Sequence, residues 1–430
     1  MNEKWGKFTV RGSAKLEEKI HEQMFHIQQR LISGLAKFPV EAVLLLGGYG
    51  RGEGGVEIKE GQEYPHNNFD FLVITPPLSG SEDSSLRRET RKLFDELAEE
   101  VELGIDYAVS NSRKLAFSPC LVMWYDMRFG HKVIIGPSDY MDQFTHFSKE
   151  NILQNDALAL LVNRATLFVI NKLMLHQRSE LSERDKRWFI KHVVKALIGY
   201  GDALLYFLGD YNWSYEEKGR RMAKRSDVDE DFKARYLDAL DFRFSPRYGE
   251  YFHLVGEQWL EENLRSCEAV HLRCEQIRLS RSMENWKDYG PSFFQFSLWD
   301  RPLSLRGWAR KAINAFRSDS CPLSELSLFE RMGYYAGGGR GKILCALPGI
   351  LYEGKPLAKE LSCRLLGLAK NAKPHELIER YLQLWAIVGD TNFARGLSKM
   401  GLHLHLGGGS DDLPNRGRTS YVLENRGSAS

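Results

Sequence analysis

The feature that most constrains the fold is an apolar run that ends abruptly in two glycines. Ala42 to Leu46 is uninterrupted apolar sequence between turn-forming residues, which is typical of a strand buried on both faces. Gly47 and Gly48 follow directly, and more glycines continue a predicted loop as far as Gly55. Because glycine has no Cβ, the backbone N–H groups of such a loop can approach an anionic oxygen closely. The segment therefore predicts a strand that leads into a phosphate-binding turn.

Helical and strand patterns alternate around this strand. Helical periodicity over 14–36 and 86–101 predicts two helices, and apolar runs over 69–74 and 105–109 predict two strands. Two more strands are expected, at the ranges 121–127 and 132–135. This alternation predicts a mixed α/β domain over residues 1–145.

The sequence pattern changes after about residue 150. Helix-compatible patterns dominate, and strand signals are few. We expect helices at 156–176, 187–208, 231–240, 257–277 and 374–388. The chain as a whole is thus expected to be α+β, with a mixed sheet first and helices after it. The predicted divisions are a helical domain at 146–285, a mainly helical region at 286–406 whose assignment the pattern leaves open, and a flexible tail at 407–430.

Composition limits the partners. Lys and Arg number 59 against 57 Asp and Glu, a net charge of +2, so no field over the whole chain draws it to nucleic acid or to membrane phosphates. The 6 cysteines form no CxxC pair, which favours reduced thiols over a disulfide or zinc framework. The start lacks a signal-peptide core, and no apolar run reaches about 18 residues. These features predict a cytoplasmic protein with no membrane partner.

Polar residues that suit a metal follow the glycine-rich segment. Asn68 and Asp70 alternate on one predicted strand, so their side chains point to the same face. Asp106 lies on another short strand and is expected to join them. A cluster of oxygen ligands on one face of a sheet can hold Mg²⁺ beside substrate phosphates.

This order of elements resembles the DNA polymerase beta-like nucleotidyltransferase superfamily. There, a strand runs into a glycine turn, a second strand carries two alternating carboxylates, and a later strand carries a third. The stretch GGYGRGE, residues 47–53, is especially similar to the version in bacterial protein-uridylylating enzymes and other nucleotidyltransferase-domain proteins. Residues 125–130 and 132–136 are similar to a strand pair that often follows the third carboxylate. The resemblance covers 40–137 firmly, whereas 201–211 is only loosely like the helical partner domain of small-molecule nucleotidyltransferases.

The resemblance implies a nucleotidyltransferase fold and transfer of a nucleotidyl group from an NTP to a hydroxyl or phosphate acceptor. Mg²⁺ or Mn²⁺ would be the cofactor, pyrophosphate the leaving group, and a small molecule the favoured acceptor over RNA or protein. The implied nucleotide-binding residues are Gly47, Gly48, Tyr49, Arg51 and Glu53, the first two at the β- and γ-phosphates. The implied metal ligands are Asn68, Asp70 and Asp106, the last two catalytic. The acceptor is expected between the α/β domain and the helices.

One departure from the family pattern matters. Asn68 stands where the first of the paired carboxylates belongs, and a neutral amide binds Mg²⁺ more weakly than a carboxylate. An acidic residue of the insert before it, Glu53 or Glu57, is expected to restore the charge if the site is active. The alternative is a nucleotide-binding pseudoenzyme with a regulatory or assembly role. A further alternative is an RNA- or protein-modifying enzyme, since the basic cluster at 218–225 lies near aromatic residues.

Three other stretches are interpreted as structural. Residues 337–342 fail the phosphate-loop pattern, because Ala336 and Ile343 occupy positions that need Gly and Ser or Thr, so a flexible turn is expected. His403 and His405 alternate, which favours a strand with one polar face over a metal site. The aromatic stretch at 286–299 is interpreted as core.

Overall fold

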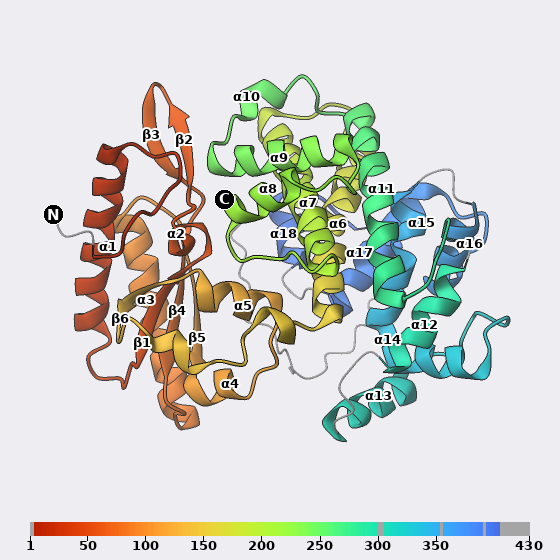
Figure 1. Ribbon diagram of the computed structural model, residues 1–430, viewed down its shortest axis with the longest axis horizontal. Helices are drawn as coiled ribbons and strands as arrows, with labels where there is room; N and C mark the ends of the chain where they lie inside the picture. The colour runs from red at the N-terminus through yellow and green to blue at the C-terminus, as the bar shows by residue number, and fades with distance from the viewer. Residues whose placement is uncertain (1–3, 287, 300–304, 353–355, 390–392, 405–430) are drawn as a thin grey trace.

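The computed structural model describes residues 4–286, 288–299, 305–352, 356–389 and 393–404. The α+β organisation is as predicted: a small mixed sheet lies in the N-terminal part, and helices follow it. Figure 1 shows the sheet between a pair of long helices on its outer side and the helical region on the other. The predicted tail and His405 lie outside the described residues, and His403 is not in a strand.

The sheet has four strands in the order β5-β4-β1-β6. β4 and β5 are parallel, and β1 is antiparallel to both β4 and β6. These strands are β1 (Ala42–Leu46), β4 (Phe69–Thr75), β5 (Ile105–Asn111) and β6 (Lys132–Ile135).

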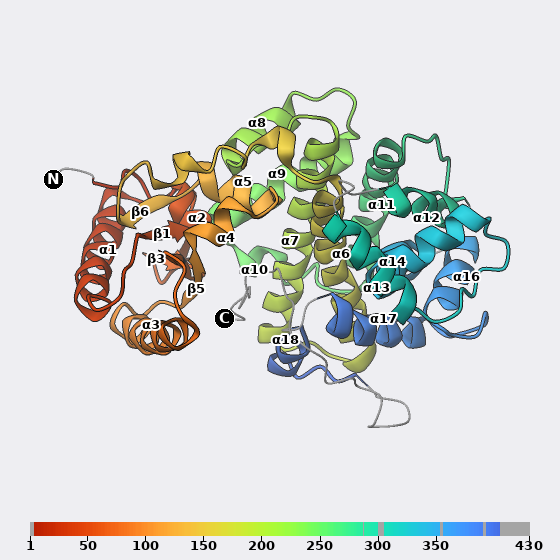
Figure 2. The same cartoon turned by 90° about the horizontal axis from the view of Figure 1, so that it is seen from below.

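The two faces of the sheet are covered by different layers. Because side chains alternate along a strand, Val43 and Leu45 pack with α1 (Ala14–Gly34) and α3 (Gly80–Glu100). Ala42 and Leu44 pack instead with the core around α4 (Ser112–Ala116) and α5 (Val122–Phe129). Figure 2 shows α1 and α3 on the side of the sheet away from the helical region. Burial of both faces accounts for the uninterrupted apolar sequence of β1.

The predicted glycine loop is wrong in part, because its first residues form a short helix, α2 (Gly47–Arg51). Gly52, at φ 78°, ends it in the left-handed conformation that glycine adopts without strain. The polar insert after it forms a hairpin of β2 (Gly55–Lys59) and β3 (Gln62–His66).

The strand predicted at 121–127 is also wrong, and so is the strand pair inferred from the resemblance there. This segment is helix α5, and only β6 is a strand. The Val122 backbone N–H, one of those a helix start leaves unpaired, donates to Asp156 Oδ2 at 2.8 Å. Val122, Trp124, Tyr125 and Met127 are buried against the sheet and the neighbouring loops. Tertiary packing thus overrides a strand-like local composition.

The helices predicted after residue 150 are all present, and helices also fill the stretch that was left open. One buried apolar cluster extends from Leu158 to Leu402, so both predicted helical parts share a core, which includes Trp286, Tyr289, Phe293 and Phe294. After two 3₁₀ turns, η1 (Tyr140–Gln143) and η2 (Lys149–Asn151), the helices are α6 (Gln154–Gln177), α7 (Glu183–Phe207), α8 (Tyr215–Ala223), α9 (Glu230–Phe244), α10 (Tyr248–Tyr251), α11 (Glu257–Leu279), α12 (Tyr289–Trp299), α13 (Leu305–Arg317), α14 (Leu328–Ala346), α15 (Pro348–Leu351), α16 (Pro356–Leu365), α17 (Pro374–Val388) and α18 (Phe393–Lys399).

The flexible turn expected at 337–342 is wrong, because these residues belong to α14. Only Gly338 departs from helical geometry there, at φ 57° and ψ −156°, and it kinks the helix. The Cβ of any larger residue at 338 would lie 3.1 Å from the Asn314 side chain.

Helix α6 is the one candidate membrane span in the described part of the chain, by length and composition, although the sequence predicted none. In the structure, 61% of its apolar window is buried inside the protein. The core helix of a soluble protein passes the same test, so α6 is weak evidence of a membrane span.

Candidate nucleotide and metal site

Two of the predicted site residues occupy the same level of the sheet. Asp70 on β4 pairs in register with Asp106 on the parallel strand β5. Phe69 and Phe71 pack toward α1 and α3, so by alternation Asp70 points to the opposite face, where the helical region lies. The structure therefore brings both carboxylates together on the face turned toward the helices.

Asn68 joins these carboxylates through its amide. Asn68 Nδ2 donates a hydrogen bond to Asp106 Oδ2 and lies 3.3 Å from Asp70 Oδ1. The predicted cluster of Asn68, Asp70 and Asp106 is thus assembled, with the amide N–H groups turned toward the two acids.

The glycine pair lies directly against this cluster. Leu46, the last residue of β1, pairs in register with Asp70, so α2 begins beside that carboxylate. Gly47 has φ 65°, and a Cβ at this position would lie 2.1 Å from Asp70 Oδ2. A Cβ at Gly48 would lie 3.4 Å from a terminal nitrogen of Arg243 and 3.2 Å from the Glu53 backbone oxygen. Gly47 therefore requires glycine, because the Asp70 carboxylate already occupies the adjacent space, whereas a side chain at 48 would make tight contacts.

The electrostatic state of Asp70 is unusual. Its pKa is raised to about 6, chiefly by burial and then by the negative charge of Asp106. Arg51, Arg243 and Lys195 oppose this shift by favouring the ionised carboxylate. A carboxyl with a raised pKa beside a second acid is a frequent property of functional sites.

Cations from the helical region surround Asp70, since Lys195 and Arg243 lower its pKa, and Arg164 lies close enough to Lys195 to lower the pKa of that lysine. Lys195 lies on α7, Arg164 on α6 and Arg243 on α9. The surrounding protein and then the like charges of its neighbours, Lys191 first, lower the pKa of Lys195 well below its usual value, although the side chain still reaches solvent. No carboxylate within the described ranges forms an ion pair with Lys195, Arg164 or Arg243. This excess of positive charge suits a polyanionic ligand.

Arg243 is held in place by an aromatic ring rather than by a carboxylate. Its guanidinium carbon lies 4.3 Å from the centre of the Tyr215 ring, and Arg51 lies 4.9 Å from the same ring. Arg243 Nε is buried and makes no hydrogen bond in the structure. Stacking orients the guanidinium but leaves its N–H groups available to an acceptor.

Three predicted nucleotide-binding residues have other roles in the structure. Tyr49 is buried, and its hydroxyl lies 2.9 Å from the Gly55 carbonyl oxygen, which ties α2 to the hairpin. Arg51 lies between Glu53 and Asp126, at 3.6 and 3.9 Å. These side chains join parts of the protein to each other.

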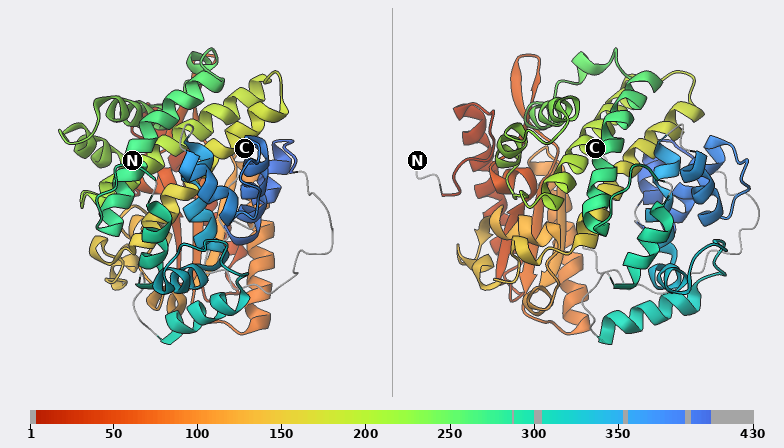
Figure 3. Two further views of the ribbon diagram at one scale, coloured as in Figure 1. Left: turned by 90° about the vertical axis from the view of Figure 1, so that its right-hand side faces the viewer. Right: turned by 45° about the vertical axis from the view of Figure 1, so that its right-hand side comes forward.

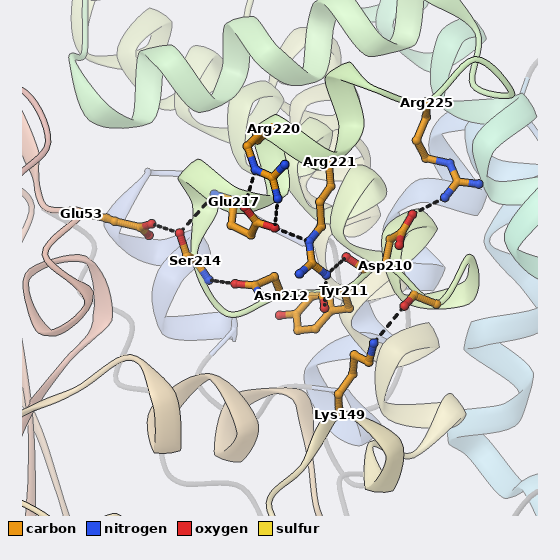
Figure 4. A network of polar contacts seen from close by, with 11 residues as sticks. Glu53, Lys149, Asp210, Tyr211, Asn212, Ser214, Glu217, Arg220, Arg221 and Arg225 are labelled. Atoms are coloured by element: carbon orange, nitrogen blue, oxygen red, sulfur yellow. Dashed lines mark hydrogen bonds and ion pairs between the residues drawn. The ribbon is translucent and has the colours of Figure 1, made fainter.

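Glu53 connects the glycine-rich segment to the helical region. Its carboxylate accepts hydrogen bonds from Ser214 Oγ at 2.6 Å, Tyr215 N at 3.0 Å and Glu216 N at 3.2 Å. Figure 4 shows Glu53 reaching Ser214 at the start of α8. An acid at a helix start satisfies unpaired N–H groups, so Glu53 is committed to α8 rather than to the Asn68 cluster.

The Glu57 carboxylate also pairs with residues outside the Asn68 cluster. It lies 2.6 Å from Arg187 and 3.2 Å from His66 Nδ1. The hydrogen bond from His66, together with Arg187, lowers the pKa of Glu57 to about 2. The charge missing at Asn68 is therefore restored by neither of the acids proposed for it.

The basic cluster at 218–225 is largely neutralised by the protein itself. Arg220 and Arg221 both pair with Glu217 at 2.6 Å, and buried Lys218 pairs with Asp202 at 2.8 Å. Arg225 pairs with acids as well, one of which is Asp210 (Figure 4). These pairings favour a structural role over an RNA-binding one.

The donor atoms of the cluster decide whether it suits a divalent cation. Among the described residues, no group of three or more His, Cys, Asp or Glu side chains is placed to hold a metal. Asp70 and Asp106 supply two carboxylates, whereas the Asn68 amide presents its N–H groups to them, so its oxygen joins the donor set only when the amide is turned over. Oxygen ligands of this kind suit Mg²⁺ or Mn²⁺, and a ligand with phosphate oxygens would complete the shell. The residues thus fit one such ion, with fewer charges than a site of three carboxylates.

Comparison with known proteins gives no function for this chain, so a proposal depends on the geometry of the site. No protein-family model matches the chain, and no curated protein sequence matches it.

The cations of the helical region were not predicted from the sequence. Arg187, Lys191 and Lys195 recur at four-residue steps on α7, which places them on one face of the helix. That spacing was a usable signal. Arg164 and Arg243 carried no local signal, because only the packing of α6 and α9 brings them to the site.

Proposed function

We propose that this protein binds a nucleoside triphosphate with a divalent cation and transfers its nucleotidyl group to a small-molecule acceptor. The observation that carries the proposal is the pairing of Asp70 with Asp106 beside Gly47 and Gly48, near Lys195 and Arg243, which have no carboxylate partner in the part of the chain that the structure describes. Acids alone would repel a triphosphate, and cations alone would give no metal ligand. Their juxtaposition is what a complex of a metal ion with a nucleotide requires.

The residues divide the work as follows. Asp70 and Asp106 hold Mg²⁺ or Mn²⁺, joined by the Asn68 oxygen once a half-turn of the amide replaces its N–H groups, and the ion when bound neutralises charge on the phosphates. Lys195, Arg164 and Arg243 neutralise the remaining charge of the triphosphate. Gly47 and Gly48 let the phosphates approach the backbone, because no side chain intervenes.

The transfer itself needs a base and a leaving group. Asp106, on the edge strand β5, takes the proton of the acceptor hydroxyl while the hydroxyl oxygen bonds to the α-phosphorus. The bond between the α-phosphorus and the oxygen that bridges it to the β-phosphorus breaks, and pyrophosphate leaves. A small acceptor is favoured because the basic cluster at 218–225 is paired internally.

The test is pyrophosphate release by the purified chain with each labelled NTP and Mg²⁺ or Mn²⁺, alongside NTP binding by equilibrium dialysis. Asp70→Ala and Asp106→Ala are expected to abolish release. Asp95→Ala, which removes an exposed acid from α3, is the matched control and is expected to leave it unchanged. No binding of any NTP by the unaltered protein would overturn the proposal.

A second candidate is a protein that binds the nucleotide without turnover. The specific observation in its favour is Asn68, whose amide N–H groups bond both carboxylates where a third acid would increase metal affinity. NTP binding without pyrophosphate release, with any acceptor class supplied, would support it.

A further inference from the structure

Helix α13 (Leu305–Arg317) has its polar and apolar faces reversed relative to a helix packed on a protein core. Its apolar residues 308, 309, 312, 313 and 316 recur at one-, three- and four-residue steps, which places them on one face. This face is exposed: Ile313 is 50% exposed and Phe316 94%. An amphipathic helix on a globular protein normally buries such a face.

The opposite face of α13 is the one that contacts the protein. Asn314 Nδ2 donates to the Ala336 carbonyl oxygen of α14 at 2.9 Å. Lys311 is buried and donates to the Leu298 carbonyl oxygen of α12. The helix is therefore held by its polar side chains, and its apolar face is turned outward.

The charge on α13 has a single sign. Its sequence contains Arg306, Arg310, Lys311 and Arg317 and no Asp or Glu. Arg310 and Arg317 are exposed. The nearest acid after the helix, Asp319, lies 3.6 Å from Lys342 of α14. An apolar face bordered by arginines describes a helix that lies in the interface of an anionic membrane.

The position of the helix agrees with this use. Figures 1 and 3 show α13 at the lower edge of the molecule, and Figure 1 shows it apart from the N-terminal sheet. A second copy of the chain is the less favoured occupant, because pairing of two α13 helices would bring positive charges together.

We propose that α13 docks this protein onto the surface of an anionic lipid bilayer, with Trp308, Ile313 and Phe316 inserted among the headgroups and upper acyl chains. Arg310 and Arg317 contact lipid phosphates. This proposal is independent of the nucleotide site and needs no membrane-spanning segment.

The experiment is flotation of the full chain with phosphatidylcholine vesicles, with and without phosphatidylglycerol. Binding is expected only with phosphatidylglycerol and is expected to weaken as salt rises. Phe316→Glu should lower the partition coefficient by about tenfold or more, because burial of an aromatic ring contributes that much. Phe117→Glu changes a residue that is 81% exposed beside α4, and it is the matched control expected to bind like the unaltered chain.

Three results would overturn the proposal. They are no binding to anionic vesicles, equal binding by Phe316→Glu, and a dimer in light scattering that Phe316→Glu converts to a monomer while vesicles capture neither form. The last result would assign the face to a second copy. Binding of the chain to an acidic protein, with no binding to lipid vesicles, would assign the face to that protein instead. NTP binding, measured in parallel, is expected to be equal for Phe316→Glu and the unaltered chain.

Discussion

Asp70 and Asp106 stand at paired positions of two neighbouring parallel strands, with the amide of Asn68 hydrogen-bonded to Asp106. Two acids at one level of a sheet repel each other, and a stable fold gains nothing from that repulsion. The arrangement therefore makes sense as a site for a positively charged ligand, and it makes the following predictions.

Removal of the Asp70 charge is expected to stabilise the folded protein. The folded-state pKa of about 6 lies above the unfolded value near 3.8, so the ionised carboxylate destabilises the fold above pH 6. Asp70→Asn should raise the free energy of unfolding by about 2 kcal/mol at pH 7.5, and the gain should shrink as pH falls through 6 toward 4. Urea unfolding at several pH values measures it. Asp95→Asn on α3 should show no such gain, and an Asp70→Asn variant less stable than the unaltered chain at pH 7.5 would contradict the prediction.

Gly47→Ala is expected to damage the site far more than an alanine at another left-handed glycine. Gly47 and Gly61 both have positive φ, at 65° and 77°. A Cβ at 47 meets the Asp70 carboxylate, whereas a Cβ at 61 meets nothing within 4 Å. Gly61→Ala should therefore lower the free energy of unfolding only through backbone strain, by about 1 kcal/mol. Gly47→Ala should in addition displace Asp70 and abolish NTP binding. Equal NTP affinities for the two variants would refute this account of Gly47.

The cations of the helical region are expected to determine triphosphate affinity. Arg243→Ala and Lys195→Ala should each weaken NTP binding by about tenfold or more, since charge-assisted hydrogen bonds to phosphate are among the stronger polar contacts. The loss should be smaller for a nucleoside monophosphate. Arg88→Ala, which removes an exposed arginine of α3, should leave affinity unchanged. Unchanged NTP affinity in both site variants would exclude α7 and α9 from the nucleotide site.

Asn68→Asp is expected to increase affinity for Mn²⁺ by about tenfold, because a third carboxylate replaces a neutral ligand. Titration followed by electron paramagnetic resonance measures it, with Asn155→Asp on α6 as the control. Pyrophosphate release then separates the two functional candidates. An enzyme releases pyrophosphate with Asn68 in place, whereas a pseudoenzyme releases none until position 68 is acidic.

A large part of the N-terminal architecture could be predicted from local pattern. The run from Ala42 to Leu46, the alternation of Asn68 with Asp70 and the position of Asp106 were sufficient to place a carboxylate pair on one face of a sheet. Period-two alternation and burial on both faces are local properties of a chain, so they can be inferred without tertiary contacts.

Helix α5 shows where such inference failed. Its composition is suited to a strand, yet Asp156 accepts from its first backbone N–H, and its buried side chains pack across the sheet. Asp156 and the sheet strands that α5 contacts are distant from it in the sequence. The same is true of α13, whose amphipathic pattern does not tell which face the protein covers.

The sequence by itself determined the strands that carry the acids and the predominance of helices after residue 150, because these depend on side-chain periodicity. Only the tertiary structure decided that Glu53 binds the start of α8, that Arg243 approaches Gly48 and that the charge of Lys195 acts on Asp70. Such contacts join elements far apart in the chain, and their electrostatic effect depends on distance and burial, which are properties of the packed molecule.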